Sequence, residues 1–290
     1  MNIQWYPGHM TKTRRMMQAN IQLVDVVIEL LDARIPYSSK NPDMDQLAAN
    51  KKRLVLLNKS DLAEPDATKL WEEYYRKQGF HTIAISATEK KVAKRLADTV
   101  RNIMAEKIEK EKKRGRISVN IRAMVVGIPN VGKSTLINQI SGGLGRSGTP
   151  TTTADRPGVT RGKQWVKVAK DFDLLDTPGV LWPKFEDEEV GKRLAFTGSV
   201  NDVILDTVLL SQELISWLLT QKPDALFSRY KLPEEAHGLT PDMILEAIAL
   251  SRGFKLKGGV ADLERTSVTL LDEFRAGRLG KISLERPGSN

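Results

Sequence analysis

The sequence predicts an α/β fold: a doubly wound, mainly parallel sheet followed by a small all-helical domain. Two observations carry this prediction. Short apolar runs alternate with helical patterns from residue 24 to residue 175, which is typical of a parallel sheet covered by helices. Beyond residue 185 the pattern becomes helical, with few β-branched alternations. We therefore expect two domains, residues 1–184 and residues 185–290.

The elements begin with a basic N-terminal arm. Residues 5–10 indicate a turn, and Thr11 is the expected cap of a cationic helix of about ten residues that contains Arg14 and Arg15. Mixed Glu and Lys over residues 90–116 indicate a solvated helix. Apolar spacing predicts the remaining elements. Strands are expected at 24–31, 53–57, 81–85, 121–126, 164–168 and 172–175, and helices at 65–78, 208–219, 240–250 and 262–274.

The composition limits the classes of partner. The 290 residues include 45 Lys and Arg against 36 Asp and Glu, a net charge of +9, and no cysteine. The positive excess favours a polyanion. No apolar run approaches the length of a membrane span, so we expect nucleic acid as the partner and no membrane. Disulfides and thiolate metal sites are excluded. We expect a cytoplasmic monomer.

A phosphate-binding loop is expected between the fourth strand and the helix that follows it. Residues 127–134 fit G-x-x-x-x-G-K-[ST] at every defined position. Backbone N–H groups and the helix N-terminus would hold phosphate oxygens. Lys133 would reach the β- and γ-phosphates, and Ser134 would bind Mg²⁺. The residues expected to contact the nucleotide here are Asn130, Val131, Gly132, Lys133, Ser134 and Thr135.

A guanine-recognition signature, Asn-Lys-x-Asp, follows the second expected strand. It consists of Asn58, Lys59, Ser60 and Asp61. The Asp61 carboxylate can accept hydrogen bonds from N1–H and the exocyclic amine of guanine, a pair of donors that adenine lacks. Asn58 would bind the other edge of the base, and the Lys59 stem would lie along the ring. Ser86 and Ala87 would meet the guanine carbonyl through a backbone N–H, or else form a simple turn. The expected ligands are GTP and GDP.

Residues that would sense the γ-phosphate come after the phosphate-binding loop. The stretch 141–162 is rich in Gly, Thr, Arg and Pro and has no apolar period, as functional loops often do. Thr160 is the expected switch I ligand of Mg²⁺, with residues 151–153, all threonine, as alternatives. Asp176, at a strand tip, would bind Mg²⁺ directly or through water. Gly179 would offer its N–H to the γ-phosphate.

The order of these motifs is unusual. In most GTPases the phosphate-binding loop comes first, whereas here residues 58–61 and 86–87 precede residues 127–134. The same site can form if the sheet is threaded from another starting strand, because the termini of compact domains often lie close together. The sequence therefore predicts a circularly permuted P-loop GTPase domain. Loss of the γ-phosphate is expected to change the orientation or RNA affinity of the helical domain that follows residues 176–179.

Three stretches, together with the permuted order, resemble the ribosome biogenesis GTPase A family, the YlqF-type proteins. They are Pro7-Gly8-His9-Met10, Asp32-Ala33-Arg34-x-Pro36 and residues 176–183 (Asp-Thr-Pro-Gly-Val-Leu-Trp-Pro). The similarity spans essentially the whole chain. It implies a GTPase that binds the immature large ribosomal subunit and promotes its late maturation. It also implies that the C-terminal helical domain contacts ribosomal RNA.

The residues for hydrolysis are harder to assign. Val180 occupies the position after the switch II glycine, where many GTPases carry a glutamine that orients water. His9 can hydrogen-bond water and titrates near neutrality. It is either catalytic, as the resemblance implies, or a structural or RNA-contacting residue. Lys133 and Thr160 complete the candidate catalytic set. Asn130 resembles a ligand of a K⁺ ion that bridges the phosphates, or else stabilises the turn.

Two other functions compete with a ribosome-stimulated GTPase. One is a GTP-gated RNA-binding scaffold with negligible turnover, which Val180 allows. The other is an enzyme that acts on tRNA with GTP as a cofactor, but the sequence holds no second catalytic constellation. The basic loop 252–259, which includes Phe254, would contact RNA phosphate and stack a base, or be an ordinary solvated loop.

Overall fold

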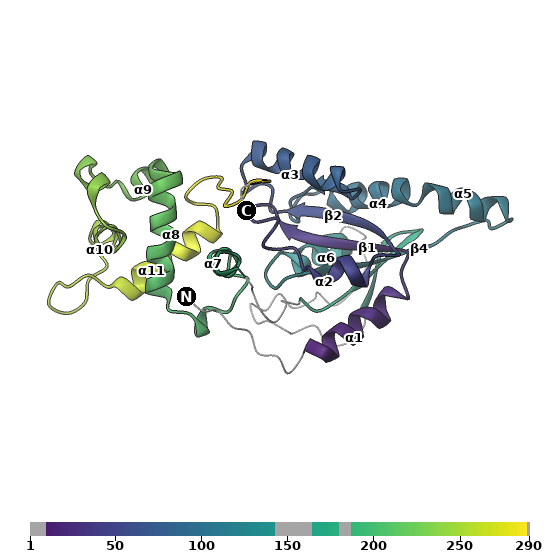
Figure 1. The fold of residues 1–290 in the computed structure, drawn as a ribbon, viewed down its shortest axis with the longest axis horizontal. Coiled ribbons are helices and arrows are strands. Elements are labelled where there is room, and N and C mark those ends of the chain that lie inside the picture. Colours follow the sequence, from purple (N-terminus) through teal and green to yellow (C-terminus); the bar gives the residue numbers. More distant parts are fainter. Residues whose placement is uncertain (1–9, 143–163, 180–186, 289–290) are drawn as a thin grey trace. The chain divides into compact units, whose positions relative to one another are not determined.

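The structure is a computed structural model that describes residues 10–142, 164–179 and 187–288. Contacts divide the chain into two compact units. The sheet unit contains the described residues up to 179 together with residues 283–288, and the helical unit contains residues 187–282 (Figure 1). Among the described residues, no helix is long and apolar enough to span a membrane.

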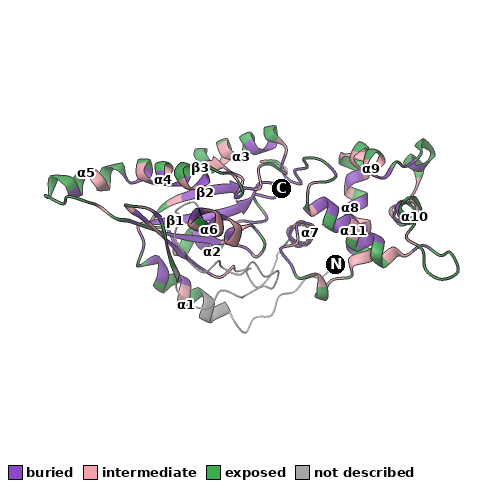
Figure 2. Ribbon diagram, turned by 180° about the vertical axis from the view of Figure 1, so that it is seen from behind, coloured by how far each residue is buried: buried purple, intermediate pink, exposed green. Residues whose placement is uncertain are grey.

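A six-stranded sheet forms the centre of the sheet unit. Its strands are β1 (Val26–Asp32), β2 (Lys52–Asn58), β3 (His81–Ala84), β4 (Ile121–Gly127), β5 (Gln164–Ala169) and β6 (Phe172–Asp176). The order is β3-β2-β1-β4-β6-β5, and neighbours run parallel except for β5, which pairs antiparallel with β6 at one edge. β1 is buried along its whole length, as expected for a parallel sheet covered on both faces (Figure 2).

Helices cover both faces of this sheet. They are α1 (Met10–Ile21), α2 (Asp43–Leu47), α3 (Pro65–Lys77), α4 (Val92–Ile103), α5 (Ala105–Lys113) and α6 (Lys133–Gly142). On one face, α1 and α2 pack around Val27 and Met124, while α3 covers Leu57 with Trp71 and Tyr75. On the other face α6, in front of the sheet in Figure 2, packs beside α4. The predicted doubly wound, mainly parallel sheet is confirmed.

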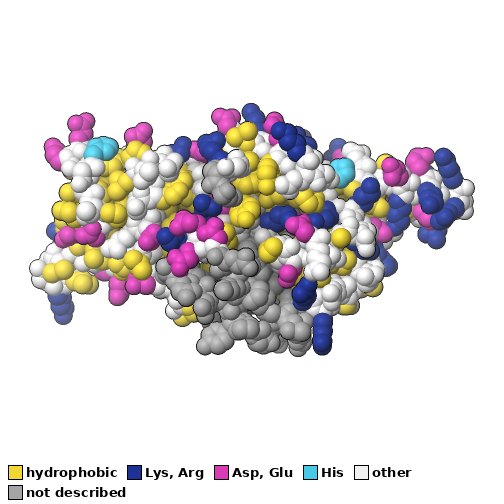
Figure 3. All heavy atoms as spheres, viewed as in Figure 1, with side chains coloured by type: hydrophobic (Ala, Val, Ile, Leu, Met, Phe, Trp, Pro, Cys, Tyr) yellow, Lys and Arg dark blue, Asp and Glu magenta, His cyan; other side chains and the backbone are white. Residues whose placement is uncertain are grey.

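The charged segment between β3 and β4 forms two helices with different surroundings. α4 buries an apolar face that includes Leu96 and Val100. α5 is more polar, and its Lys110, Lys112 and Lys113 are exposed. Figure 3 shows basic and acidic side chains mixed on this helix. The expected solvated helix therefore corresponds to α5, whereas α4 belongs to the core of the sheet unit because of its apolar spacing.

The helical unit is built around one apolar helix. Its helices are α7 (Glu188–Phe196), α8 (Thr207–Gln221), α9 (Pro223–Tyr230), α10 (Pro241–Arg252) and α11 (Leu263–Arg275), with 3₁₀ turns at Asp202–Ile204 and Glu234–Gly238. α8 packs against the other four helices and buries Leu210, Leu214 and Leu218 completely. The carboxylates of Asp206 and Asp262 cap α8 and α11. The predicted all-helical domain is confirmed.

Two details differ from the sequence-based expectations. α1 begins at Met10, so Thr11 lies inside the helix and cannot be its N-cap, which needs non-helical backbone angles. The second detail concerns the chain end, which we expected to belong to the helical domain. Ser283 and Glu285 instead bond to the sheet unit. Local patterns could not reveal this, because residues 283–288 form no regular element.

Candidate nucleotide-binding site

The expected site residues lie at one edge of the sheet. β2, β1, β4 and β6 run parallel, so their carboxyl ends share this edge, which is where ligands bind in open α/β sheets. The strands end at Asn58, Asp32, Gly127 and Asp176. The motifs at residues 58–61 and 127–134, about seventy residues apart in the sequence, thus lie at the same edge despite their permuted order.

The phosphate-binding loop has backbone angles that suit its glycines. Gly132 has a φ of 95° and Asn130 a φ of 56°, both in the left-handed region that glycine tolerates best. A Cβ on Gly132 would clash with Asn58 Nδ2, and one on Gly127 would lie 2.8 Å from the carbonyl oxygen of Leu30. The two glycines therefore let this loop approach its neighbours closely.

Lys133 and Asp176 form a buried ion pair at the start of α6. Lys133 Nζ lies 3.1 Å from Asp176 Oδ1, and both side chains are buried. The Thr177 hydroxyl donates to the Val125 carbonyl at 2.6 Å, which fixes the chain that leaves β6. Ser134, in the first turn of α6, is half-buried. A hydroxyl and a carboxylate on adjacent elements are oxygen donors of the kind Mg²⁺ prefers, so these residues fit the ion.

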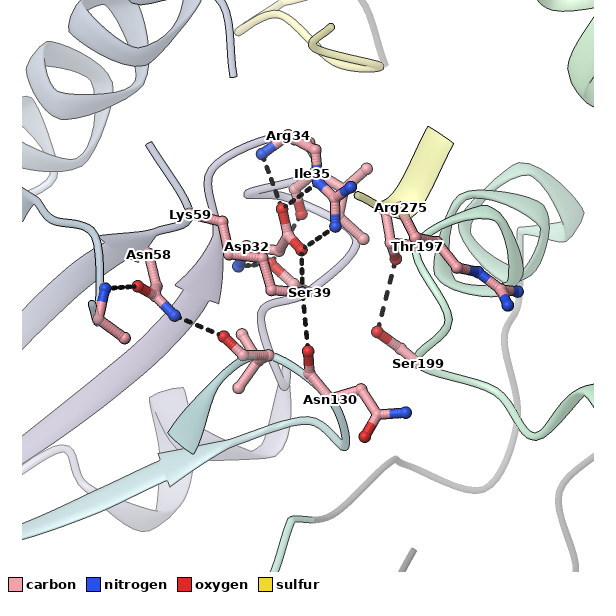
Figure 4. A network of polar contacts seen from close by, with 12 residues as sticks. Asp32, Arg34, Ile35, Ser39, Asn58, Lys59, Asn130, Thr197, Ser199 and Arg275 are labelled. Atoms are coloured by element: carbon pink, nitrogen blue, oxygen red, sulfur yellow. Dashed lines mark hydrogen bonds and ion pairs between the residues drawn. The ribbon is translucent and has the colours of Figure 1, made fainter. Parts of the chain in front are cut away.

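Asn58 joins the two loops that are expected to contact different parts of a nucleotide. Its Nδ2 donates to the Val131 carbonyl at 2.7 Å, and its Oδ1 accepts from the Ala87 N–H at 2.8 Å (Figure 4). The side chain is buried. Asn58 therefore holds the phosphate-binding loop and the Ser86–Ala87 turn in a fixed relation, a role that our sequence analysis did not predict.

Lys59 is held by Asn130, an expected site residue, and by Asp32, which the sequence analysis did not assign to the site. Its Nζ donates to the Asn130 carbonyl at 2.7 Å and lies 3.0 Å from Asp32 Oδ2 (Figure 4). Arg34 binds the same carboxylate with its side chain, Nε at 2.9 Å and Nη2 at 2.8 Å. Burial opposes ionisation of Asp32, but Arg34 and Lys59 outweigh it and hold its pKa well below the usual range. The sequence signal that could have identified Asp32 and Arg34 is a buried strand that ends in Asp and is followed by Arg two residues later.

The other residues expected to recognise guanine make the following contacts. Asp61 is exposed. Burial lowers the pKa of Arg34, yet the charges of Asp32 and Asp61 together with hydrogen bonding raise it overall. The Ser60 N–H donates to the Ile85 carbonyl at 3.1 Å, and Ser86 shares a hydrogen bond with Thr88 at 2.9 Å.

Several predicted site residues lie outside the described ranges. They are His9, Thr160, the alternatives at 151–153, and Val180. Gly179 is described and half-buried, and a Cβ on it would lie 3.2 Å from the backbone of Pro129. Asn130 is exposed, and in Figure 4 its carboxamide points away from the Asp32–Lys59 pair. Thr135 is half-buried on α6.

Comparisons with known proteins bear on this site. A model of the 50S ribosome-binding GTPase family matches residues 122–226. Ribosome biogenesis GTPase A of Priestia megaterium is 43% identical over 288 residues, covering 99% of this chain and 98% of that protein. The Thermotoga maritima protein of the same name is 30% identical, over 98% of this chain and 95% of its own.

Solved structures with the same fold cover nearly the whole chain. The crystal structure of GNP-bound YlqF from T. maritima matches with a TM-score of 0.65 and 26% identity, over 96% of this chain and 99% of that one. A GDP-bound structure of TM YlqF matches with a TM-score of 0.64, also at 26% identity, over 94% of this chain and 99% of that one. The family model starts at residue 122, within β4, whereas the match to the Priestia megaterium relative covers 99% of this chain and so includes the Asn58 loop upstream of it. With phosphate-binding and guanine-recognition loops at one sheet edge in permuted order, the chain belongs to the ribosome biogenesis GTPase A family.

Proposed function

We propose that this protein is a GTP-driven switch that binds the large ribosomal subunit and its rRNA and promotes late assembly of that subunit. The observation that carries the proposal is the Asn58 bridge, which couples a guanine-recognition loop to a phosphate-binding loop. The names of the relatives, ribosome biogenesis GTPase A and 50S ribosome-binding GTPase, support the ribosomal partner. We also propose that the protein is cytoplasmic and monomeric.

Each loop would have a separate task in nucleotide binding. Asp61 would accept hydrogen bonds from guanine, and Lys59 would lie along the base. Lys133 would leave Asp176 for the β- and γ-phosphates, which carry more negative charge than one carboxylate. Ser134 and Asp176, with Thr160, would hold Mg²⁺. When bound, Mg²⁺ neutralises charge that develops on the phosphates.

Hydrolysis would need a group that orients water, because Val180 cannot form a hydrogen bond through its side chain. We propose His9 for this role, brought to the γ-phosphate when the subunit binds. Asn130 would bind K⁺ beside the phosphates. This ion would supply positive charge where no arginine finger is evident. Both assignments depend on a partner or an ion, so we expect slow turnover by the protein alone.

The helical unit would contact rRNA through its basic loop, residues 252–259. Lys255 and Ala261 form an isolated antiparallel bridge, which makes the basic loop a short hairpin. Arg265 lies over the Phe254 ring with its guanidinium carbon 4.2 Å from the ring centroid. A base that stacks on Phe254 would therefore compete with Arg265, whereas phosphate contacts by Lys255 and Lys257 would not.

Multiple-turnover GTP hydrolysis, measured with and without large ribosomal subunits and with tRNA as a control polyanion, tests this function. We expect stimulation of at least about tenfold by large subunits in KCl and none by tRNA. Asp61→Asn should lose about 100-fold in GTP affinity, because the amide offers a donor where guanine also has one. The same variant should gain xanthosine triphosphate as a substrate. His9→Ala should lose the stimulated rate.

Three results would contradict parts of the proposal. Equal rates with and without subunits favour the alternative, a GTP-gated RNA-binding scaffold with negligible turnover, provided that the subunits bind. Full stimulated turnover by His9→Ala removes His9 from the reaction. Equal rates in NaCl and KCl remove the K⁺ role of Asn130.

A further inference from the structure

The last described residues form a buried segment on the sheet unit. We call residues 283–286 the C-terminal strap; it runs beside α3 in Figures 1 and 2. The Ser283 hydroxyl accepts the Glu64 N–H at 3.0 Å, and the Glu285 carbonyl accepts Trp71 Nε1–H at 3.2 Å. Both strap residues are buried. The strap therefore has defined anchors at both ends of its buried part.

The side chain of Glu285 organises the loop that follows β1. Its carboxylate accepts the Tyr37 N–H at 2.8 Å and the Ser38 N–H at 3.2 Å, and it also accepts the Ser38 hydroxyl. The Leu284 N–H donates to the Arg34 carbonyl at 2.9 Å. Two backbone donors of this loop and one hydroxyl thus depend on a residue about 250 positions away in the sequence.

The same loop holds the guanine-recognition lysine. The Ser39 hydroxyl accepts the Asp32 N–H at 3.0 Å, and the Arg34 N–H donates to Asp32 Oδ1 at 3.0 Å. Asp32 in turn pairs with Lys59, whose Nζ reaches the carbonyl of Asn130 in the phosphate-binding loop. All of these contacts join largely buried groups, except the one between Lys59 and the Asn130 carbonyl.

We propose that the C-terminal strap is a positioning element of the nucleotide site, in which Glu285 fixes the loop after β1 and thereby holds Asp32 and Lys59 for guanine recognition. This inference rests on the proposed guanine site at residues 58–61. In this proposal Glu285 makes no contact with the base or the phosphates. It acts through Asp32 and Lys59.

The physical reason is the cost of unpaired buried donors. Without the Glu285 carboxylate, the buried N–H and hydroxyl of Ser38 and the part-buried N–H of Tyr37 lose their acceptor, and such donors move to find another or admit water. The loop after β1 would then leave the conformation that places Asp32. Ile282, the last residue of the helical unit, is joined by a peptide bond to Ser283. A change at the end of the helical unit can therefore reach the guanine site through the chain itself.

Dissociation of a fluorescent GDP analogue from the full-length protein, chased with excess GDP, tests the proposal. We expect Glu285→Ala to release the analogue about tenfold faster than wild type. Ser38→Ala removes one of the three donors and should give a smaller increase in the same direction. A control outside the strap, Glu106→Ala at an exposed position on α5, should stay within about twofold of wild type.

A second readout separates positioning from general loosening of the fold. Inosine diphosphate lacks the exocyclic amine of guanine, so the ratio of GDP to inosine diphosphate affinity reports on the guanine contacts. Glu285→Ala should lower this ratio, and its effect should shrink in an Asp32→Asn background because both changes act on Lys59. Circular dichroism establishes that each variant is folded at the assay temperature.

The outcomes distinguish the two proposals. If wild type binds GDP no better than ADP, the guanine site itself is wrong. If wild type selects GDP but Glu285→Ala and Ser38→Ala keep its dissociation rate and its ratio, the strap does not position the site. If Glu285→Ala does not fold, an unchanged ratio in Ser38→Ala still overturns the inference.

Discussion

At the edge of the sheet, a buried carboxylate, that of Asp32, is paired with two cationic side chains. Asp32 accepts hydrogen bonds from Arg34 and forms an ion pair with Lys59. These groups are buried except for part of the Lys59 side chain. A buried carboxylate without such partners would be protonated, whereas this one stays ionised. It therefore gives Lys59 a fixed position beside the phosphate-binding loop.

Asp32→Asn should change stability in a pH-dependent way. Burial opposes the charge of Asp32, but Arg34 and Lys59 hold its pKa well below the usual range. An unfolded Asp takes up a proton near pH 3.9, so below about pH 5 the unfolded state binds more protons and the free energy of unfolding falls. We expect Asp32→Asn to lose about 3 kcal/mol at pH 7 and to show less decline towards acid pH.

Urea unfolding from about pH 3.5 to pH 7 measures this effect. Asp98→Asn provides the matched control, because Asp98 is an exposed carboxylate on α4, and it should change the free energy of unfolding by less than about 0.5 kcal/mol. An acid limb in Asp32→Asn as steep as in wild type would contradict the role of this carboxylate.

At the scale of elements, the site is formed by short connections between buried strands and helices. The apolar runs and their punctuation predicted β1 to β6, α3, α8, α10 and α11 with ends close to those observed. α2, α7 and α9 were not predicted individually. They are short, and helices of this length depend on packing against neighbours more than on their own propensity. Motif residues at strand ends were predictable because a parallel sheet gathers those ends.

Two glycines at opposite ends of α6, Gly132 and Gly142, allow a matched test of the phosphate-binding loop. Gly132→Ala would strain a backbone at φ 95° and clash with Asn58. We expect a loss of about 1–3 kcal/mol in the free energy of unfolding and at least about tenfold in GDP affinity, about 1.4 kcal/mol. The loss arises at the bridge between the two loops.

Gly142→Ala is the control for that substitution. Gly142 ends α6, and an added Cβ meets nothing within 4 Å. Alanine favours helix, so this variant should be as stable as wild type or more stable by up to about 1 kcal/mol, with unchanged GDP affinity. Thermal unfolding and equilibrium titration with the fluorescent GDP analogue measure both variants. Equal behaviour of the two would show that the close approach at Gly132 is unimportant.

At the scale of the molecule, the helical unit is joined to the sheet unit at both of its ends. One connection follows Gly179, which would contact the γ-phosphate, and the other is the C-terminal strap next to the guanine site. The net charge of +9 on the whole chain favours a polyanionic partner such as the proposed rRNA. The two connections give a physical route by which GTP hydrolysis and rRNA binding can affect each other.

Large-subunit binding should therefore depend on both salt and nucleotide. Because Lys and Arg that contact phosphates release counterions, affinity should fall at least about tenfold between about 50 and 200 mM KCl. Affinity with a non-hydrolysable GTP analogue should differ from that with GDP by at least about fivefold. Co-sedimentation with purified subunits measures both. Equal affinity in the two nucleotide states would rule out the switch. Affinity that does not change with salt would exclude Lys and Arg contacts to phosphate as the basis of binding.

The sequence by itself determined the fold class, the nucleotide and the permuted order. These depend on local patterns: apolar period, glycine spacing and the chemistry of Asn58 and Asp61. Only the tertiary structure decided that Asn58 links two loops, that Asp32 and Arg34 hold Lys59, and that Glu285 reaches back to Ser38. Those contacts join residues far apart in the chain and involve side chains with no motif of their own, so they exist only once the sheet has brought their backbones together.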